Sequence, residues 1–134
     1  MNRQTGKSPN QRKLRVGEEL RHALAQIMER TEFRDPGLEG VFVTITEVRV
    51  SPDLRNATVF VIPLGGVDVG PVVAGLNRIK SFLRREVSHM VRLQYSPNLS
   101  FEPDRSFENA QHIEALLHSP EVLRDVGGND DGEA

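Results

Sequence analysis

The 134-residue chain contains no cysteine and no tryptophan. Without cysteine it can form neither disulfides nor thiolate metal sites, a composition that fits a reducing compartment. Its longest apolar runs are far shorter than the roughly 20 residues that span a bilayer. The polar N-terminus also lacks the apolar region of a signal peptide. We therefore expect a soluble cytoplasmic protein with no membrane partner.

Aromatic residues are scarce, with six phenylalanines and one tyrosine. A base-stacking surface of the kind used on single-stranded RNA is therefore poorly provided for. The formal net charge of −2 conceals an uneven distribution, because residues 1–92 hold 15 Lys and Arg against 10 Asp and Glu, whereas residues 93–134 hold 2 against 9. The basic groups are thus concentrated in the first two thirds of the chain.

The most informative stretch is Pro71–Arg92, which reads as a helix with a weak point near its middle. Its apolar residues recur at steps of three and four and form one stripe. Arg78, Arg85 and Arg92 are spaced by sevens and project from nearly the opposite side. The segment would bury one face and show guanidinium groups on the other. Charge alone leaves two readings open, a contact with RNA phosphate and a solvated helix back.

The chain before this stretch is predicted to form an arm, a helix and a hairpin. Residues 1–10 lack an apolar pattern and are predicted to be a disordered arm. A helix is predicted at Gln11–Arg30, where Gly17 costs about 1 kcal/mol relative to alanine. That cost suggests that another element approaches closely there. Strands at Val41–Val50 and Ala57–Leu64 are rich in β-branched residues and predict an antiparallel hairpin.

Two details complete the expected architecture. The alternation of the first strand changes parity, which predicts a bulge near Thr46–Glu47. A short third strand is predicted at about Leu99–Glu102 and a last helix at Ser106–His118. Because the long helix lies between the hairpin and the third strand, we expect the third strand to run parallel to the first.

The resulting order, α-β-β-α-α-β-α, predicts an α+β fold with a three-stranded mixed sheet and its helices on one face. The domain is predicted to occupy residues 11–118. Residues 119–134 are predicted to form a short turn followed by an acidic, disordered tail.

Several short stretches of the chain form an ordered set. They are Arg15–Arg21, Val50–Val59, Leu76–Arg78, Phe82–Arg85 and Pro97–Phe101, with Asp104, Ser106, Ile113, Leu116 and Leu117. Together they resemble the ribosome-binding factor A family of bacterial ribosome-assembly proteins, over a match that runs from about Leu14 to Leu117. The hairpin sequence Val50–Val59 is the most specific of them; each fragment alone is weak, but their order along the chain makes the set strong.

The resemblance implies a single KH-like domain of the second topology, α-β-β-α-kink-α-β, here followed by a C-terminal helix. It implies binding to the free small ribosomal subunit and its rRNA during late maturation. It also implies a role in processing the 5′ end of that RNA and in growth in the cold, without catalysis. We expect a monomer that uses no cofactor and no small-molecule substrate.

One position departs from the family pattern. Ordinary KH domains clamp RNA with a GXXG loop between two helices, whereas this family has an Ala-x-Gly kink there. The matching positions read Ile79-Lys80-Ser81, so we expect either a milder kink or one made by the Ser81 hydroxyl bonding back to a carbonyl. A GXXG sequence at Gly37–Gly40 precedes the first strand and carries Glu39, which repels phosphate, so we interpret it as an ordinary loop.

Phosphate binding requires cations on accessible surfaces, and arginine can hold a phosphate through two hydrogen bonds. We expect five or six of the basic candidates to contact RNA, and favour those at positions 78, 80, 84 and 85. Arg84 lies nearer the apolar stripe, so pairing with an acid is an alternative for it, and Arg55 is interpreted as a turn residue. The candidate RNA-binding residues are Arg12, Lys13, Arg15, Arg21, Arg78, Lys80, Ser81, Arg84, Arg85 and Arg92.

No catalytic or metal-binding motif accompanies these cations. His22, His89, His112 and His118 have no partner at metal-ligand spacing, and the chain has no P-loop, dinucleotide fingerprint or nucleophile elbow. The alternatives left open are a different KH-type RNA-binding protein, a protein-binding adaptor that uses the hairpin and the last helix, and a small enzyme acting on RNA.

Overall fold

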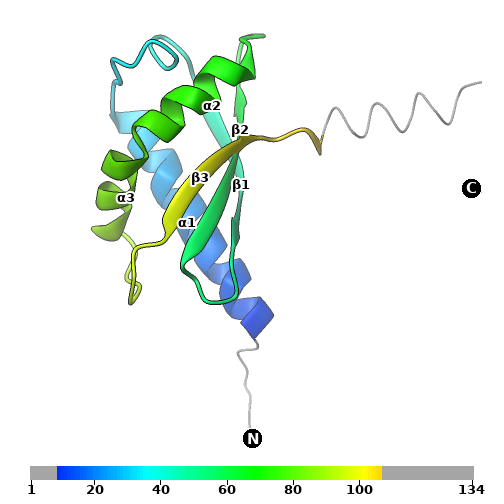
Figure 1. The fold of residues 1–134 in the computed structure, drawn as a ribbon, viewed down its shortest axis with the longest axis vertical. Helices are drawn as coiled ribbons and strands as arrows, with labels where there is room; N and C mark the ends of the chain where they lie inside the picture. The colour runs from blue at the N-terminus through cyan, green and yellow to red at the C-terminus, as the bar shows by residue number, and fades with distance from the viewer. Residues whose placement is uncertain (1–8, 107–134) are drawn as a thin grey trace, which may run out of the picture. The chain divides into compact units, whose positions relative to one another are not determined.

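The computed structural model describes residues 9–106, which form a helix, two strands, two helices and a third strand, in that order (Figure 1). This order confirms the expected α-β-β-α-kink-α-β arrangement, although the first helix begins earlier than predicted. The predicted arm before Pro9, the last helix beyond Ser106 and the acidic tail lie outside the described residues. The elements are α1 (Pro9–Arg30), β1 (Val43–Val50), β2 (Asn56–Pro63), α2 (Val69–Arg78), α3 (Lys80–Ser88) and β3 (Asn98–Pro103).

The middle strand of the sheet is β2, which pairs antiparallel with β1 and parallel with β3. The mixed sheet is confirmed. However, β3 runs parallel to β2 and therefore antiparallel to β1, so the expectation that it would run parallel to the first strand was wrong. The physical reason is the crossover: the chain leaves the sheet from β2, and α2 and α3 return it to the end where β2 began.

The helices cover one face of the sheet. The buried strand residues alternate with exposed or half-buried ones, and the pairing places Val59 opposite both Val48 and Phe101. Because side chains alternate between faces, all the buried strand residues share the face that the helices cover. They are Ile45, Val48, Ala57, Val59, Val61, Leu99 and Phe101.

The predicted bulge in the first strand is confirmed. The register between β1 and β2 shifts between Ile45 and Glu47, so Thr46 is the extra residue. The Thr46 hydroxyl donates a hydrogen bond to the carbonyl oxygen of Phe60 at 3.2 Å. The extra residue restores the alternation, so that Ile45 and Val48 both enter the core.

The first helix crosses β1 closely at Gly17. A Cβ atom at this position would lie 2.6 Å from the carbonyl oxygen of Val48, so only glycine allows the observed approach. This confirms the reading of Gly17 as a point of close contact. One apolar stripe of α1 is buried throughout, at Val16, Leu20, Ala23, Leu24 and Ile27.

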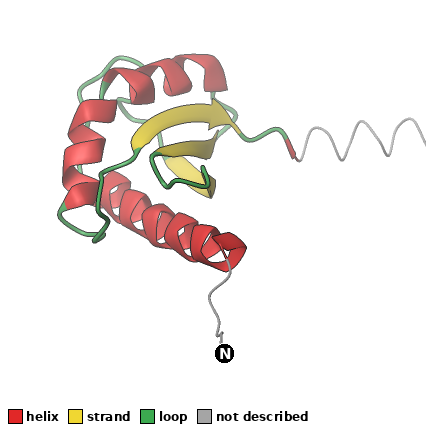
Figure 2. Cartoon of the chain, turned by 60° about the horizontal axis from the view of Figure 1, so that its bottom comes forward, coloured by secondary structure: helices red, strands yellow, loops and turns green. Residues whose placement is uncertain are grey.

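The central stretch is broken at Ile79, which confirms the expected kink (Figure 2). Ile79 has φ of −102° and ψ of 13°, and its N–H is shared between the carbonyls of Gly75 and Leu76 at 3.2 Å each. Figure 2 shows α2 and α3 meeting there at a sharp bend. The Ser81 hydroxyl is exposed and makes no hydrogen bond within residues 9–106. The alternative of a Ser81 bond was therefore wrong, and the break lies in the main chain at Ile79.

Candidate RNA-binding surface

Arg78, the last residue of α2, is held by an acid from the loop before β1. Its Nε lies 2.8 Å from Asp35 Oδ2 and its Nη2 lies 2.7 Å from Asp35 Oδ1. These hydrogen bonds lower the pKa of Asp35 to about 2 and raise the pKa of Arg78. The Asp35 side chain is only 10% exposed, whereas that of Arg78 is 53% exposed. Arg78 thus anchors α2 to the loop while part of its guanidinium stays accessible.

The same carboxylate organises the GXXG sequence. Asp35 Oδ1 also accepts a hydrogen bond from the N–H of Gly37 at 2.8 Å, and its carbonyl accepts from Leu38 and Glu39. Leu38 is buried in the core. This turn directs an apolar side chain inward and uses its amides internally, an arrangement unlike an RNA clamp.

Lys80 and Ser81 open α3 directly after the break. Both are exposed, and Lys80 forms no ion pair or hydrogen bond within the described part of the chain. The first N–H groups of a helix have no intrahelical partner and favour anions. Lys80 therefore places an exposed positive charge beside main-chain donors at the bend.

Arg84 and Arg85 are adjacent on α3 but have different surroundings. The Nε and Nη2 of Arg84 lie 3.1 Å and 2.7 Å from the carbonyl oxygen of Ser96, so this side chain holds the loop before β3. The alternative weighed for Arg84, an acidic partner, was wrong, because its partner is this neutral carbonyl. The Arg85 guanidinium lies 5.8 Å from the centroid of the Phe82 ring and has no ion pair among residues 9–106.

The remaining candidates lie on α1 and after α3. Arg21 pairs with Glu18, with Nη2 and Oε1 2.9 Å apart, which raises the pKa of Arg21 and lowers that of Glu18. Four others have no ion pair in the described part of the chain: Arg12, Lys13, Arg15 and Arg92. Three of these four are exposed, and Lys13 is half-buried.

The structure does not gather the ten candidates into one patch. Figure 1 shows the first half of α1, with Arg12, Lys13 and Arg15, at the opposite end of the molecule from the bend that carries Arg78 and Lys80. The second half of α1 does approach α3, as the 3.4 Å contact between Arg30 Nη2 and Glu86 Oε1 shows. RNA that touched both groups would therefore have to extend along the molecule.

One contact was missed by sequence reasoning. Arg55, interpreted as a turn residue, lies over the ring of Tyr95, with its guanidinium carbon 4.1 Å from the ring centroid. The two residues are distant in sequence, and the periodicity of apolar residues does not predict a contact between a hairpin turn and a loop before another strand. The one available signal was that the chain's single tyrosine follows the basic helix.

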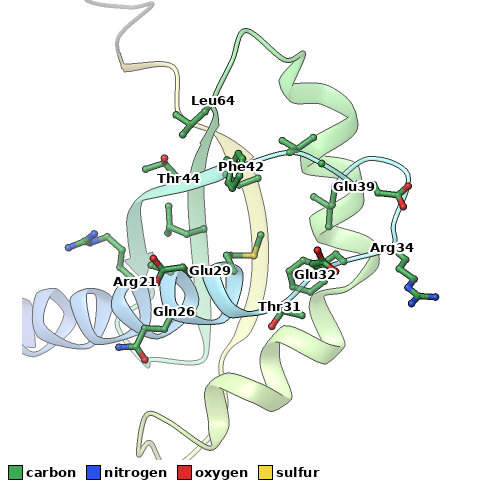
Figure 3. Close-up of a pocket in the computed structure, with 18 of the residues that line it drawn as sticks. Arg21, Gln26, Glu29, Thr31, Glu32, Arg34, Glu39, Phe42, Thr44 and Leu64 are labelled. Carbon is green, nitrogen blue, oxygen red and sulfur yellow. The ribbon is translucent and has the colours of Figure 1, made fainter.

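A hollow of about 850 Å³ lies between the second half of α1, the loop after it and the start of β1 (Figure 3). Its lining combines apolar side chains with Arg21, Arg34, Glu29, Glu32 and Glu39. Phe42 at its edge is 77% exposed. Three carboxylates against two guanidinium groups make this hollow a poor site for phosphate.

The described residues provide neither a metal site nor a membrane segment. Among residues 9–106, no group of three or more His, Cys, Asp and Glu side chains is arranged to hold a metal ion. No helix in this range is long and apolar enough to cross a membrane.

Comparison with known sequences finds one family over most of the chain. The family model of ribosome-binding factor A matches residues 12–117. The chain is 62% identical over 120 residues to the ribosome-binding factor A of Paramagnetospirillum magneticum, covering 90% of this chain and 84% of that protein. It is 53% identical over 133 residues to that of Rhodospirillum rubrum, covering 99% and 81%.

Solved structures agree with this result. A solution structure from Thermotoga maritima, described as a putative ribosome binding factor A, has a TM-score of 0.61 at 33% identity and covers 75% of this chain and 94% of that one. The crystal structure of ribosome-binding factor A from Thermus thermophilus has a TM-score of 0.60 at 26% identity, covering 70% and 97%. A homology model of the Thermus factor, fitted into a cryo-EM map of a 30S complex, has a TM-score of 0.53 at 26% identity, covering 66% and 91%.

Proposed function

Because this chain belongs to the ribosome-binding factor A family, we propose that it is a maturation factor that binds the free small ribosomal subunit. The family consists of assembly factors that are not enzymes, and its bacterial members act in the cytoplasm, as expected from the sequence. The Thermus factor placed in a map of a 30S complex supports this choice of partner. Assistance to 5′-end processing of the subunit's rRNA is part of the proposal.

The observation that carries the RNA-binding part is a set of cations without internal partners. Six of the basic candidates form neither an ion pair nor a side-chain hydrogen bond within residues 9–106. Cations left unpaired on a surface can neutralise phosphates and release counterions, which is the main source of affinity for nucleic acid. These six are Arg12, Lys13, Arg15, Lys80, Arg85 and Arg92.

The mechanism requires no chemistry on the RNA. A factor that binds only one conformation of the subunit stabilises that conformation by its difference in affinity between states. We propose that this chain recognises the folded rRNA by shape and charge and holds a late conformation until processing is complete. Since catalysis is not needed, the mixed lining of the hollow has no reactive role in this scheme.

Sedimentation tests the proposal directly. A tagged chain is expressed at its natural level, and lysate is separated on a sucrose gradient. The protein is expected with free small subunits and to be depleted from assembled ribosomes. Its presence only at the top of the gradient, or equally in both ribosomal fractions, would contradict the assignment.

The salt dependence separates this function from the adaptor alternative. Phosphate neutralisation lowers the logarithm of the affinity by about 0.7 to 0.9 per contact for each logarithm of salt. A slope of several units for binding to purified small subunits is expected. A nearly flat slope would favour an adaptor that binds ribosomal proteins, for which the partly apolar hollow beside Phe42 would be the first candidate surface.

A further inference from the structure

The contact between Arg55 and Tyr95 brings together two segments that the sequence keeps apart. Arg55 belongs to the turn between β1 and β2, whereas Tyr95 belongs to the loop between α3 and β3. The guanidinium carbon lies 4.1 Å from the ring centroid, within the range of a stacked cation–π pair. Tyr95 is 48% exposed and Arg55 is also exposed.

Hydrogen bonds hold the turn and the loop in place beneath this pair. The carbonyl of Arg55 accepts a hydrogen bond from the N–H of Asn98 at 2.8 Å. The side-chain Nδ2 of Asn98 donates a hydrogen bond to Oδ1 of Asn56 at 3.4 Å. The carbonyl of Ser96, the residue after Tyr95, is held by Arg84. The stacked pair is therefore positioned before any partner arrives.

The turn itself is closed by its own side chains. The Ser51 hydroxyl and the N–H of Arg55 both donate to Asp53 Oδ1, at 2.7 Å and 3.1 Å. Leu54 adopts a positive φ of 63°, which turns the chain sharply just before Arg55. Asp53 thus uses its carboxylate inside the turn, and the Arg55 guanidinium itself makes no hydrogen bond within the described residues.

We propose that Arg55 and Tyr95 form a stacking site for one unpaired nucleobase of rRNA, with the base lying on the outer face of the guanidinium. RNA-binding proteins commonly stack exposed bases on aromatic rings and arginine planes. The scarcity of aromatic residues argues against an extended stacking surface, but one ring suffices for one base. Arg92, an exposed cation without an ion pair among the described residues, lies three positions before Tyr95 in the same connection.

This inference rests on the proposed function but concerns a separate contact. If the stacked pair served only to hold the hairpin against the loop, its exposure at the surface would contribute nothing to that role. Such a pair would also not distinguish single-stranded RNA from a duplex, whose bases are already stacked on one another. The preference for single strands is therefore the property that identifies the site.

The chain offers its own reporter, because Tyr95 is its only tyrosine and it has no tryptophan. We expect a short oligouridylate to change the tyrosine emission of the full chain, and its duplex with oligoadenylate to leave the emission unchanged. An unchanged emission at high oligouridylate, no measurable binding of oligouridylate, or an equal response to the duplex would each overturn the site.

Substitutions then separate stacking from charge. Arg55→Lys keeps the charge but loses the plane, and should weaken oligouridylate binding about 5- to 100-fold with an unchanged salt slope. Tyr95→Phe should bind as the unsubstituted chain does. Arg49→Lys is the matched control, because Arg49 lies 5.0 Å from the Phe60 ring in a comparable pair on the exposed face of the sheet.

Equal binding by the Arg55→Lys and Arg49→Lys variants would reject the inference, and thermal melting of both confirms that they are folded. Sedimentation with small subunits keeps the two proposals apart. If Arg55→Lys leaves oligouridylate binding unchanged while the chain still sediments with small subunits, the stacking site is wrong and the maturation function stands. If the unsubstituted chain itself did not sediment with small subunits, the proposed function on which the site depends would be wrong.

Discussion

The α2–α3 bend and the first half of α1 both carry predicted RNA-binding cations, but they use them differently. At the bend, Arg78, before the break, is engaged by Asp35, while Arg84, after the break, holds a loop carbonyl. On α1, Arg12 and Arg15 are exposed and have no ion pair in the described part of the chain. Two of the basic side chains at the bend, Arg78 and Arg84, therefore help to hold the fold together, whereas Arg12 and Arg15 do not.

This difference shows that the spacing of charges in a sequence does not tell which charges are available. Cations near the start of a helix also oppose the helix dipole, so the α1 group is not explained by local stability. A partner with negative charge would compensate for that arrangement. We therefore expect α1 to contribute more to RNA binding than the paired arginines at the bend, although the bend was the region favoured by the sequence.

The largest expected effect is on binding to small subunits, when the positive charges of the α1 group and of the bend are removed in separate variants. Replacing Arg12, Lys13 and Arg15 by glutamine should weaken binding to small subunits about 100-fold and reduce the salt slope by about two to three. Replacing Arg78, Lys80 and Arg84 by glutamine should reduce the slope by about one and lower the melting temperature instead. Binding isotherms over a range of salt concentrations and thermal melts measure both quantities. Equal slopes for the two triple variants would erase the distinction between the regions.

Gly17 offers a second test, because it allows the first half of α1 to pack closely against β1. Gly17→Ala raises helix propensity by about 1 kcal/mol, but its Cβ would lie 2.6 Å from the main-chain oxygen of Val48. We expect the steric clash to outweigh the gain in helix propensity, so that the free energy of unfolding falls by about 1 to 3 kcal/mol. Urea denaturation measures the change.

The control for this substitution is Gly70→Ala in the first turn of α2. A Cβ there would meet only Asp68 Oδ1, at 3.9 Å. This variant should be neutral or slightly more stable, through the propensity gain alone. If Gly17→Ala behaved in the same way, α1 would not be seated on the strand as closely as the structure indicates.

Much of the fold could be predicted because it depends on local patterns. The buried stripe of α1 follows from period 3.6, the bulge at Thr46 from a change of parity, and the break near Ile79 from a weak point in a long helix. Each of these signals lies within a few residues of the feature that it predicts. The direction of β3 was not predicted correctly, because periodicity identifies a strand but not its neighbour.

The candidate site could be predicted only as a list of side chains. Asp35 and Arg78 are 43 positions apart, and Arg84 reaches a main-chain carbonyl that has no sequence signature at all. Partners of this kind are decided by how elements pack after they form. The sequence therefore indicates which residues carry charge and which helix faces they occupy, but not which charges the fold has already engaged.

The smallest expected effect is a pH dependence that belongs to the bend alone. The pKa of Asp35 is about 2 in the folded chain against an ordinary value of 3.8, because the Arg78 guanidinium stabilises the carboxylate. A carboxyl with a lowered pKa stabilises the fold above its ordinary pKa, and this contribution is lost as the pH falls through the folded value. Asp35→Asn should therefore be less stable than the unsubstituted chain at pH 5, and the difference should shrink between about pH 4 and pH 2.

Urea midpoints across this range measure that difference, and the other carboxyls with lowered pKa, Glu18 and Asp53, are common to both proteins. Arg78→Gln is the matched variant, because it removes the guanidinium and leaves the carboxyl in place. Arg78→Gln should therefore lose most of the pH-dependent stability that Asp35→Asn loses. A gap between Asp35→Asn and the unsubstituted chain that stayed constant from pH 5 to pH 2 would mean that the ion pair is not formed in solution. Arg78 would then be as available as Arg12 and Arg15, and the two ends of the molecule would be equivalent candidates for binding RNA.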